Sequence, residues 1–220
     1  MENPKLATQR LAKSYADRGD PNGWFEEFYV RAGGDISKVY WADLKPNPLL
    51  LAWIKEHPAP AGRSAITIGC GLGDDAELLA RNGYRVTAFD ISQSAIAMCR
   101  KRYPDSTVDY QIADLFNHPV EWRRGFNLVY ECNTIQILAG LSRVRAFEAI
   151  SDLVTSGGKI IVSCRSRKTC EPLDTFPLAL DREELNGFQR AGLSETHFVA
   201  YDDDQAPPVP HFFAVYKRPA

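Results

Sequence analysis

The sequence has no long apolar run. No stretch of its 220 residues approaches the roughly 20 consecutive apolar residues that a membrane-spanning helix needs. The opening residues Met1–Lys5 also lack the apolar segment of a secretory signal peptide. We therefore expect a cytoplasmic protein with no membrane partner.

An excess of charge of either sign is also missing. The 26 Lys and Arg residues nearly balance the 28 Asp and Glu residues, and no long basic run occurs. Short basic clusters such as Arg100–Arg102 and Arg123–Arg124 are typical of solvated helix and loop faces. Because nucleic-acid binding depends on concentrated positive charge, we expect no nucleic-acid partner.

Metal-ligand spacings are absent as well. The five cysteines form no Cys-x-x-Cys pair, and the four histidines show no paired spacing, so we expect free thiols and no metal site. Cys132 and Cys164 fall near strand ends, where a reactive thiol is an alternative to a buried, inert one.

What the sequence does contain is an alternation of helical and strand periods after about residue 60. This alternation predicts a Rossmann-like, doubly wound and mostly parallel α/β sheet. Strands are expected at 65–68, 84–90, 108–113, 126–131 and 159–164, the last after a turn at 155–158. Helices are expected at 75–82, 94–103, 142–154 and 181–192.

The end of the chain breaks this alternation. The connection between the expected strands 195–201 and 211–217 is too short for a crossover helix, so these strands should pair as an antiparallel hairpin. With 45% hydrophobic residues the chain can bury one full core. We expect residues 1–58 to form a helical cap and residues 59–220 to form the ligand-binding domain.

Residues 65–80 are the most informative segment, because they combine a short apolar strand, a glycine-rich turn and a helix start. Gly69, Gly71 and Gly73 allow a sharp turn and a close approach of the backbone to a ligand. Because position 74 is Asp, the spacing is Gly-x-Gly-x-Gly and not the Gly-x-Gly-x-x-Gly of dinucleotide enzymes. The turn therefore favours the adenosine and amino-acid parts of S-adenosylmethionine over a pyrophosphate.

Two acidic residues follow the next strands. Asp90 lies nineteen residues after Gly71, a separation at which a carboxylate can receive ribose hydroxyls across a βαβ unit. Asp114 follows the third expected strand in the same way. A helix cap or a solvated loop acid is the alternative for each. Together with the glycine turn they predict an S-adenosylmethionine site, with S-adenosylhomocysteine as the product.

These features resemble a known fold. Thr67–Gly73, Asp90, Asp114 and Gly157–Gly158, with the final hairpin, are similar to the class I S-adenosylmethionine-dependent methyltransferase fold over residues 60–220. In this family the resemblance implies a cofactor site formed by Gly69, Cys70, Gly71, Asp90, Ile91, Asp114, Leu115 and Glu131. Within it, Asp90 would bind the ribose and Ile91 would pack on the adenine.

The N-terminal part narrows the resemblance. Trp24–Phe28 and Val39–Pro48 resemble the aromatic cap and the proline-Trp-Asp stretch of the thiopurine, thiol and halide methyltransferases, although Tyr40 stands where that group often has proline. Glu171–Leu178 resembles its proline-rich lid.

The same resemblance implies an aromatic lid over the cofactor sulfonium, formed by Trp24, Phe28 and Trp41. Aromatic faces attract such a cation by roughly 0.5–2 kcal/mol. Packing of the cap onto the core is the alternative role for these side chains.

The resemblance also implies the residues of the reaction centre. Glu131, Asn133 and Arg143 would be catalytic, while Tyr40, Arg143 and Arg165, or Arg167, would bind the acceptor. For each arginine a surface salt bridge is the alternative. An in-line methyl transfer needs alignment and desolvation more than acid or base groups.

We expect a small-molecule acceptor, a thiol or another soft sulfur, selenium or halide nucleophile, methylated without metal by a monomer or weak homodimer. Methylation of oxygen, nitrogen or a carboxylate is an alternative, and so is a catalytically silent cofactor-binding module. The signature of amino methylation of nucleic-acid bases is absent, since Glu131–Thr134 stands in its place.

Overall fold

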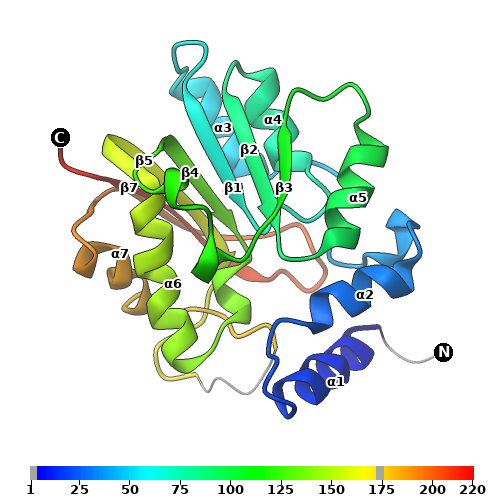
Figure 1. Ribbon diagram of the computed structural model, residues 1–220. Helices are drawn as coiled ribbons and strands as arrows, with labels where there is room; N and C mark the ends of the chain where they lie inside the picture. Colours follow the sequence, from blue (N-terminus) through cyan, green and yellow to red (C-terminus); the bar gives the residue numbers. More distant parts are fainter. Residues whose placement is uncertain (1–3, 172–175) are drawn as a thin grey trace.

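The computed structural model describes residues 4–171 and 176–220, and its centre is one seven-stranded sheet (Figure 1). Its strands are β1 (Ser64–Ile68), β2 (Arg85–Asp90), β3 (Asp109–Ile112), β4 (Phe126–Cys132), β5 (Val154–Arg165), β6 (Ser194–Asp202) and β7 (Pro210–Lys217). The order is β3-β2-β1-β4-β5-β7-β6, and β7 runs in the opposite direction to the other six strands. The expected parallel sheet with a C-terminal antiparallel pair is confirmed.

Helices cover both faces of this sheet. They are α1 (Pro4–Ala16), α2 (Trp24–Ala32), α3 (Pro48–Glu56), α4 (Asp74–Arg81), α5 (Gln93–Arg102), α6 (Gly140–Leu153) and α7 (Gly187–Arg190). Their starts follow local rules. The Asn47 side chain accepts hydrogen bonds from the first turn of α3, which has Pro48 in its first position, and Ser92 caps α5 in the same way.

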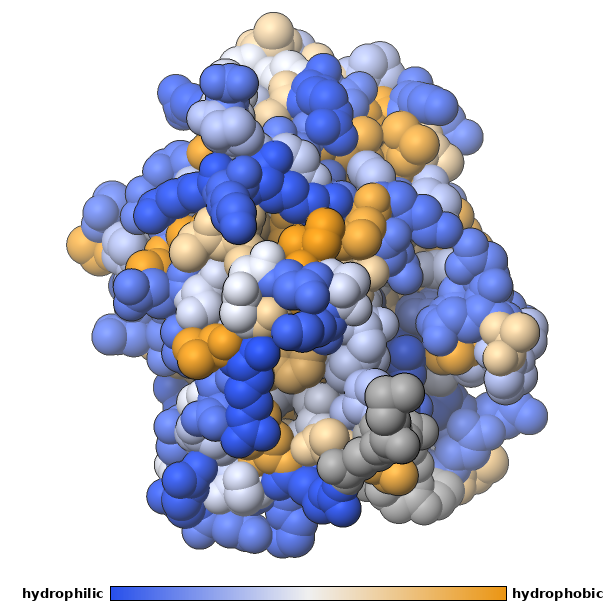
Figure 2. All heavy atoms as spheres, turned by 90° about the vertical axis from the view of Figure 1, so that its right-hand side faces the viewer, coloured by the Kyte–Doolittle hydropathy of each residue, from blue (hydrophilic) through white to orange (hydrophobic). Residues whose placement is uncertain are grey.

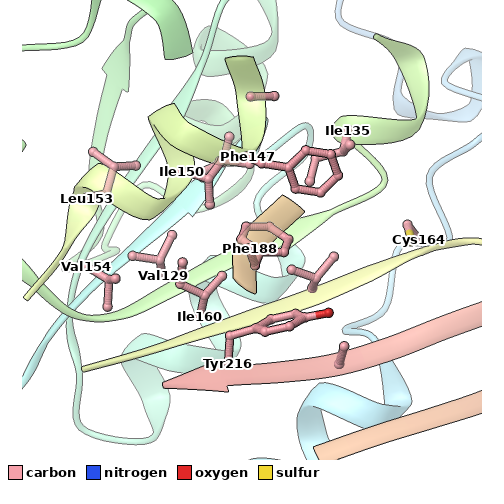
Figure 3. Packing of buried hydrophobic residues seen from close by; sticks show 14 of the residues in the cluster. Val129, Ile135, Phe147, Ile150, Leu153, Val154, Ile160, Cys164, Phe188 and Tyr216 are labelled. Carbon is pink, nitrogen blue, oxygen red and sulfur yellow. The ribbon is translucent and has the colours of Figure 1, made fainter. Parts of the chain in front are cut away.

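Two hydrophobic clusters hold the layers together. On one face, α6 and α7 pack on β4, β5 and β7 through residues that include Val129, Phe147, Ile150, Ile160 and Phe188 (Figure 3). On the other face, α3, α4 and α5 pack on the sheet through a second cluster that includes Leu50, Leu79, Ile96, Tyr130 and Phe213. The strands therefore supply buried side chains to both faces, as expected for a doubly wound sheet.

The expected turn at 155–158 is wrong, because β5 already begins at Val154. Gly157 has a φ of +70° and forms an irregularity within the strand pairing, opposite the register shift between Phe126 and Leu128. Arg218 stabilises it through backbone hydrogen bonds to Gly157 and Gly158. The glycines thus form a bulge and not a turn.

The expected helix at 181–192 is also wrong in length. Asp181 does accept hydrogen bonds from the backbone of Glu183 and Glu184, as a capping acid should. A 3-10 turn at 184–186 and the four-residue α7 then follow. A Cβ at Gly187 would lie 2.4 Å from the Phe147 ring, so the chain passes very close to α6 here.

The N-terminal helices divide between cap and sheet. Figure 1 shows α1 and α2 beside the end of the sheet. Tyr29 and Ala32 of α2 form a small cluster with Leu72, Ala95 and Met98, whereas α3 packs with the sheet residues. The boundary at residue 58 stays a prediction, and it assigns α3 to the cap although α3 packs on the sheet.

The outer surface of the face that carries α2 and α5 is largely hydrophilic, with separate hydrophobic areas (Figure 2). Exposed large apolar side chains are scattered among different elements, among them Leu6, Val30, Val120 and Leu141. Within residues 4–171 and 176–220, no helix has the length and apolar character that membrane crossing requires.

Candidate cofactor site

The candidate site lies where the chain connections change direction. β1 and β4 are neighbours, but β1 continues into α4 on one face and β4 continues into α6 on the other. The two connecting loops meet at this point, since the Thr134 hydroxyl donates to the Ile68 carbonyl at 3.3 Å. In open α/β sheets, ligands bind at such switch points, beyond the carboxyl ends of the strands.

The glycine turn has the sharp backbone turn that the sequence predicts. The φ values of Gly69, Gly71 and Gly73 are +56°, +53° and +87°, and residues other than glycine rarely adopt such values. A Cβ at Gly69 would lie 2.5 Å from the Thr134 hydroxyl. The glycines therefore keep a narrow cradle open between the two loops, and such a cradle suits a closely bound small molecule.

Asp90 connects the end of β2 to this turn. One of its carboxylate oxygens accepts the Gly71 N–H at 3.0 Å and the other accepts the Ser92 N–H at 2.9 Å. The side chain is buried, and this burial raises the pKa of Asp90 to about 6. Each oxygen keeps a further lone pair for a ligand hydroxyl, so the residues present fit the ribose of the predicted cofactor.

The remaining predicted adenosine contacts lie next to Asp90 or after β3. Ile91 follows Asp90 directly and is 38% exposed, so its side chain is accessible to a ligand. Asp114 accepts the Phe116 N–H at 2.9 Å and caps the 3-10 turn at 115–117, which is the alternative role considered for it. Leu115 is buried.

Cys70 lies in the turn with an unreactive thiol. A hydrogen bond with Cys99 and burial raise the pKa of the Cys70 thiol well above its usual value. Burial likewise raises the pKa of Cys132 and Cys164. All five cysteines are free, and the raised pKa values fit buried, inert thiols.

The aromatic residues of the cap gather around Trp41. Phe28 stacks on Trp41 with ring centres 3.9 Å apart, and Tyr40 and Trp24 approach it edge-on at 5.0 and 6.2 Å. Trp41 is 38% exposed, whereas Trp24 is buried against Phe176. The three predicted lid residues and the predicted acceptor-binding Tyr40 therefore do come together, with Tyr40 and Trp41 on the accessible side.

Tyr29 was not predicted as a site residue, yet its hydroxyl lies next to the glycine turn. A Cβ at Gly71 would lie 3.4 Å from the Tyr29 hydroxyl, and the Tyr29 ring is 6.0 Å from Trp41. Tyr29 is buried, and burial raises the pKa of its phenol well above the usual value. It connects the aromatic cluster of the cap with the glycine turn. Its place one residue after Phe28 was the only sequence signal for this contact.

Glu26 is a second residue that the sequence did not reveal. Its carboxylate accepts hydrogen bonds from the Ser92 hydroxyl at 2.7 Å and from the N–H and hydroxyl of Ser94 at 3.0 and 2.7 Å. Burial opposes ionisation, but the hydrogen bonds from Ser94 and Ser92 lower the pKa of Glu26. The cap thus supplies an anion to the N-terminus of α5, directly after Asp90 and Ile91.

Glu131 and Asn133 follow β4 but differ in exposure. Glu131 is fully buried; one oxygen accepts the backbone N–H of Thr134 and of Ile135, the latter at 2.9 Å. The other oxygen has no partner among the described residues. Burial raises the pKa of Glu131 to about 7. Asn133, with a φ of 62°, is exposed at the end of the strand.

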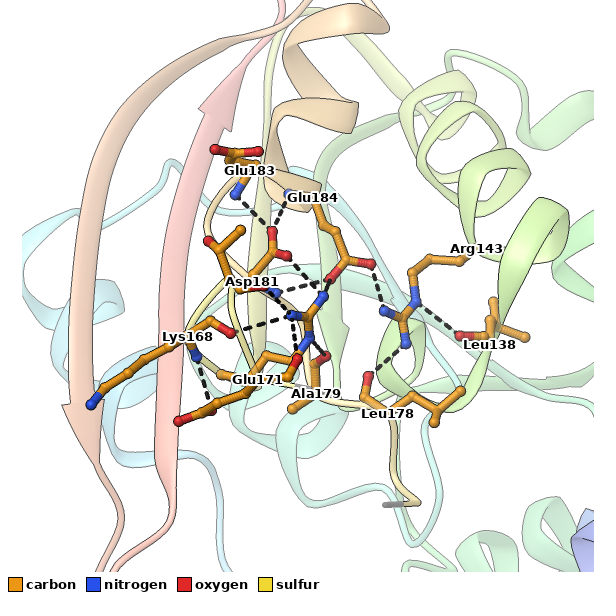
Figure 4. Close-up of polar contacts among 11 residues, drawn as sticks. Leu138, Arg143, Lys168, Glu171, Leu178, Ala179, Asp181, Glu183 and Glu184 are labelled. Atoms are coloured by element: carbon orange, nitrogen blue, oxygen red, sulfur yellow. Dashed lines mark hydrogen bonds and ion pairs between the residues drawn. The ribbon is translucent and has the colours of Figure 1, made fainter. Parts of the chain in front are cut away.

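Two of the three candidate arginines are fully engaged elsewhere (Figure 4). Arg143 donates to the Leu138 and Leu178 carbonyls and forms an ion pair with Glu184 at 2.6 Å. Arg167 pairs with Asp181 and Glu184 at 2.8 and 3.0 Å. These bonds attach the segment after residue 176 to α6 and β5. Arg165, by contrast, has no ion pair within the described part of the chain.

A polar group on the cap side of β4 and β5 was missed by the sequence analysis. The Asn47 N–H donates to Asp75 at 2.7 Å, and its side-chain amide donates to the Ser163 hydroxyl at 3.1 Å. Ser163 in turn lies 3.2 Å from the Tyr201 hydroxyl. Burial raises the pKa of Asp75 to about 6. The Asn-Pro pair at 47–48 signals a helix start, but not these distant partners.

Part of this chain is similar to known methyltransferases. A family model described as a methyltransferase domain matches residues 65–158, from β1 into β5. A ubiquinone biosynthesis O-methyltransferase from Azoarcus sp. strain BH72 is 31% identical over 109 residues, which are 46% of this chain and 47% of that protein. The corresponding protein of Azotobacter vinelandii is 30% identical over 123 residues, which cover 55% and 52% of the two chains. The chain thus spans about half the length of the curated relatives it matches.

Solved structures share the fold over a longer stretch. The N-methyltransferase NodS from Bradyrhizobium japonicum WM9, solved with S-adenosylhomocysteine, has a TM-score of 0.64 at 18% identity and covers 100% of both chains. A TehB-like methyltransferase from Corynebacterium glutamicum ATCC 13032 has a TM-score of 0.63 at 17% identity, with coverage of 88% and 98%. At these identities the likeness establishes the fold.

Residues 65–158 thus match a methyltransferase-domain family model, and the sheet order and overall fold are those of the solved class I methyltransferases. The matched residues 65–158 include the glycine turn, Asp90, Asp114 and the end of β4. The finer resemblance to the thiopurine, thiol and halide group stays a prediction.

Proposed function

We propose that this protein transfers a methyl group from S-adenosylmethionine to a small-molecule acceptor that binds between the cap and the carboxyl ends of β4 and β5. The observation that carries the proposal is the glycine turn, which is bonded to Asp90 on one side and approached by Tyr29 on the other. When bound, S-adenosylmethionine supplies an electrophilic methyl group. The residues of this chain would bind it, orient it and exclude water.

Each predicted part has a separate task in this proposal. Asp90 would accept ribose hydroxyls, Gly69 and Gly71 would allow close backbone approach, and Ile91 would cover the adenine. The aromatic cluster around Trp41 would keep water from the reacting sulfur, because aromatic faces favour a cation and offer water few partners. The exposed Asn133 would face the reaction centre. The Arg165 guanidinium, which has no ion pair among the described residues, would be available to an acceptor.

For the acceptor atom we favour a hydroxyl oxygen. The curated relatives named above are O-methyltransferases. A hydroxyl must lose its proton during transfer, and a base with a pKa near neutrality is suited to take it. Asp75 lies in the first turn of α4, and burial raises its pKa to about 6. Glu131 lies near the end of β4, and burial raises its pKa to about 7.

A thiol or another soft nucleophile is the second candidate, as the N-terminal resemblance implies. The observation that favours it is the apolar aromatic surface of Phe28, Tyr40 and Trp41. A weakly hydrated, polarizable acceptor loses little on entering such a surface, and a thiolate requires no proton removal in the transfer step.

Calorimetric titration with S-adenosylhomocysteine tests the cofactor site. Asp90→Asn keeps the shape of the side chain but removes a charged acceptor, so affinity should fall about tenfold or more. Asp105→Asn, an exposed position after α5, is the control and should bind like the wild type. Equal affinity of wild type and Asp90→Asn would contradict the proposed ribose contact.

A panel of acceptors tests the reaction. Release of S-adenosylhomocysteine is measured with phenols, thiols, thiocyanate, halides, amines and carboxylates. With a hydroxyl acceptor the rate should rise with pH through an enzyme group, and Asp75→Asn or Glu131→Gln should lower kcat more than it changes KM. With a thiol the rate should level off at the acceptor's own pKa. Cofactor binding without turnover of any acceptor would instead support a silent cofactor-binding module.

A further inference from the structure

A cavity lies at the opposite end of β1 from the glycine turn, where β1, β2 and β4 begin. Its volume is about 320 Å³, and its walls include Trp53, Arg63, Tyr84, Asn127 and Lys159. β1 starts next to Arg63 and ends directly before Gly69, so its five residues separate the two places. At about 3.3 Å per residue this separation is about 16 Å. The cavity is therefore distinct from the candidate cofactor site, and we call it the basal pocket.

The basal pocket carries positive charge without a counter-ion. Arg63 and Lys159 line it, no Asp or Glu residue does, and Lys217 is the cross-strand partner of Lys159. None of these three cations has an ion pair among the described residues. Burial lowers the pKa of Lys159, and the charges of Lys217 and Arg63 lower it further. An anion bound here would relieve this repulsion.

Aromatic rings form the other part of the wall. Trp53 and Tyr84 are only 6% and 8% exposed, so their rings are held rigidly by the core. His57 stacks on Trp53 with ring centres 4.7 Å apart, and the Lys159 ammonium lies 5.0 Å from the centre of the Trp53 ring. Positive charge and an aromatic plane therefore lie side by side in one small cavity.

Asn127 adds an uncharged donor. Its side-chain oxygen already accepts from the Ser64 N–H at 3.1 Å and from the Ser64 hydroxyl at 3.2 Å. Its amide nitrogen makes no hydrogen bond within the described residues. The polar side-chain groups available to a ligand in the pocket are thus hydrogen-bond donors, on Arg63, Asn127 and Lys159.

We propose that the basal pocket binds a small aromatic anion, a planar ring that carries a carboxylate or phosphate group. The acidic group would contact Lys159 and Arg63, and the ring would lie against Trp53 and Tyr84. The volume is at the lower end of the range for small-molecule pockets, which suits a single ring with its acidic substituent. This binding is independent of the methyl transfer proposed above.

Calorimetry on protein saturated with S-adenosylhomocysteine tests the basal pocket, with 4-hydroxybenzoate and phenyl phosphate as aromatic anions. Inorganic phosphate serves as a charge without a ring, and benzyl alcohol as a ring without a charge. At least one aromatic anion should bind with a Kd below about 1 mM, and the two partial probes should bind about tenfold more weakly. Lys159→Met should weaken the aromatic anion about tenfold. Arg63→Met, at an exposed position, should also weaken binding of the aromatic anion about tenfold. It provides the test if Lys159→Met does not fold.

Two control variants locate the bound anion. Lys55→Met changes an exposed cation on α3 outside the pocket wall and should leave the affinity unchanged. Arg165→Met changes the cation at the candidate acceptor site and should also have no effect. Equal binding by Arg63→Met and wild type, a loss in Arg165→Met alone, or no binding of either aromatic anion at about 10 mM would overturn the proposal. None of these outcomes depends on whether the protein transfers methyl groups.

Discussion

At the scale of single residues, two glycines with nearly the same backbone conformation have very different surroundings. Gly73 and Gly192 have φ values of +87° and +85°. A Cβ at Gly73 would lie 2.5 Å from the Tyr110 hydroxyl, whereas a Cβ at Gly192 would meet nothing within 4 Å. Substitution of Gly192 by alanine therefore measures the strain of a left-handed backbone alone, whereas substitution of Gly73 adds the cost of a steric clash.

We expect Gly192→Ala to lower the free energy of unfolding by about 1 kcal/mol, from backbone strain alone. Gly73→Ala should lower it by about 3 kcal/mol, because overpacking adds to the same strain. Urea denaturation followed by circular dichroism measures both values. Similar losses for the two variants would mean that Tyr110 moves aside at little cost.

Glu131 allows a second residue-scale prediction, on pH. Burial raises the pKa of Glu131 from 4.5 to about 7, so the folded state holds the proton more tightly than the unfolded state. Relative to Glu131→Gln, the free energy of unfolding of the wild type should therefore fall as pH rises from about 4.5 to about 7. Below this window there should be no difference, and above it the loss should be constant, at about 3 kcal/mol.

Denaturation of both proteins across pH 4 to 9 measures this difference. Glu148→Gln, at an exposed position on α6, is the control and should follow the wild type at every pH. If the difference between wild type and Glu131→Gln had no pH dependence, Glu131 would have a normal pKa in the folded protein.

At the scale of elements, the contact between α2 and α5 determines how the cap is held. The carboxylate of Glu26 lies at the N-terminus of α5 and accepts hydrogen bonds from Ser92 and Ser94. Glu27, the next residue, instead has its partners within the cap: it forms an exposed ion pair with Arg31 on α2 and accepts the Tyr15 hydroxyl of α1 at 3.0 Å. These two neighbouring glutamates therefore distinguish docking of the cap onto α5 from contacts within the cap.

Glu26→Gln should weaken the docking of α2 by about 1 kcal/mol, the usual cost of a lost helix cap. Amide hydrogen exchange in residues 24–41 should then become about fivefold faster, while exchange in β5 should not change. Glu27→Gln should have little effect, because exposed ion pairs contribute little. Added S-adenosylhomocysteine should slow exchange in the cap if the cap closes over the cofactor. Identical exchange of the Glu26 and Glu27 variants would show that α2 docks through its aromatic side chains.

At the scale of the whole molecule, the two proposed sites lie at opposite ends of β1. A ligand that binds only the folded state stabilises it by about 2.7 kcal/mol at a concentration of one hundred times its Kd. For a chain of this length, S-adenosylhomocysteine should thus raise the Tm by about 5–10 °C. The rise should be much smaller at the same ligand concentration in Asp90→Asn.

The basal pocket extends this prediction. Because its ligand and the cofactor touch different residues, their stabilising effects should add in free energy. Scanning calorimetry with each ligand alone and with both together measures this sum. A Tm with both ligands no higher than with one would mean that the two compete for one site.

The sequence by itself determined the features that arise within a few neighbouring elements. The spacing of Gly71 and Asp90 predicted that both belong to one site. The structure shows them in contact, because one βαβ unit brings the ends of adjacent parallel strands together. The C-terminal hairpin followed from a connection too short to cross the sheet. The aromatic cluster of the cap was also predicted as a group, although not which of its members would be buried.

Only the tertiary structure decided which distant side chains become partners. Arg143 and Arg165 look alike in the sequence, but Arg143 is paired with Glu184, 41 residues away, whereas Arg165 has no ion pair in the described part of the chain. Glu26 reaches α5 across 66 residues or more. Such contacts depend on how whole elements pack, and no local period or spacing encodes that packing. The basal pocket has the same origin, since its charged and aromatic residues come from α3, β5 and the residues just before β1 and β2, which meet only in the folded chain.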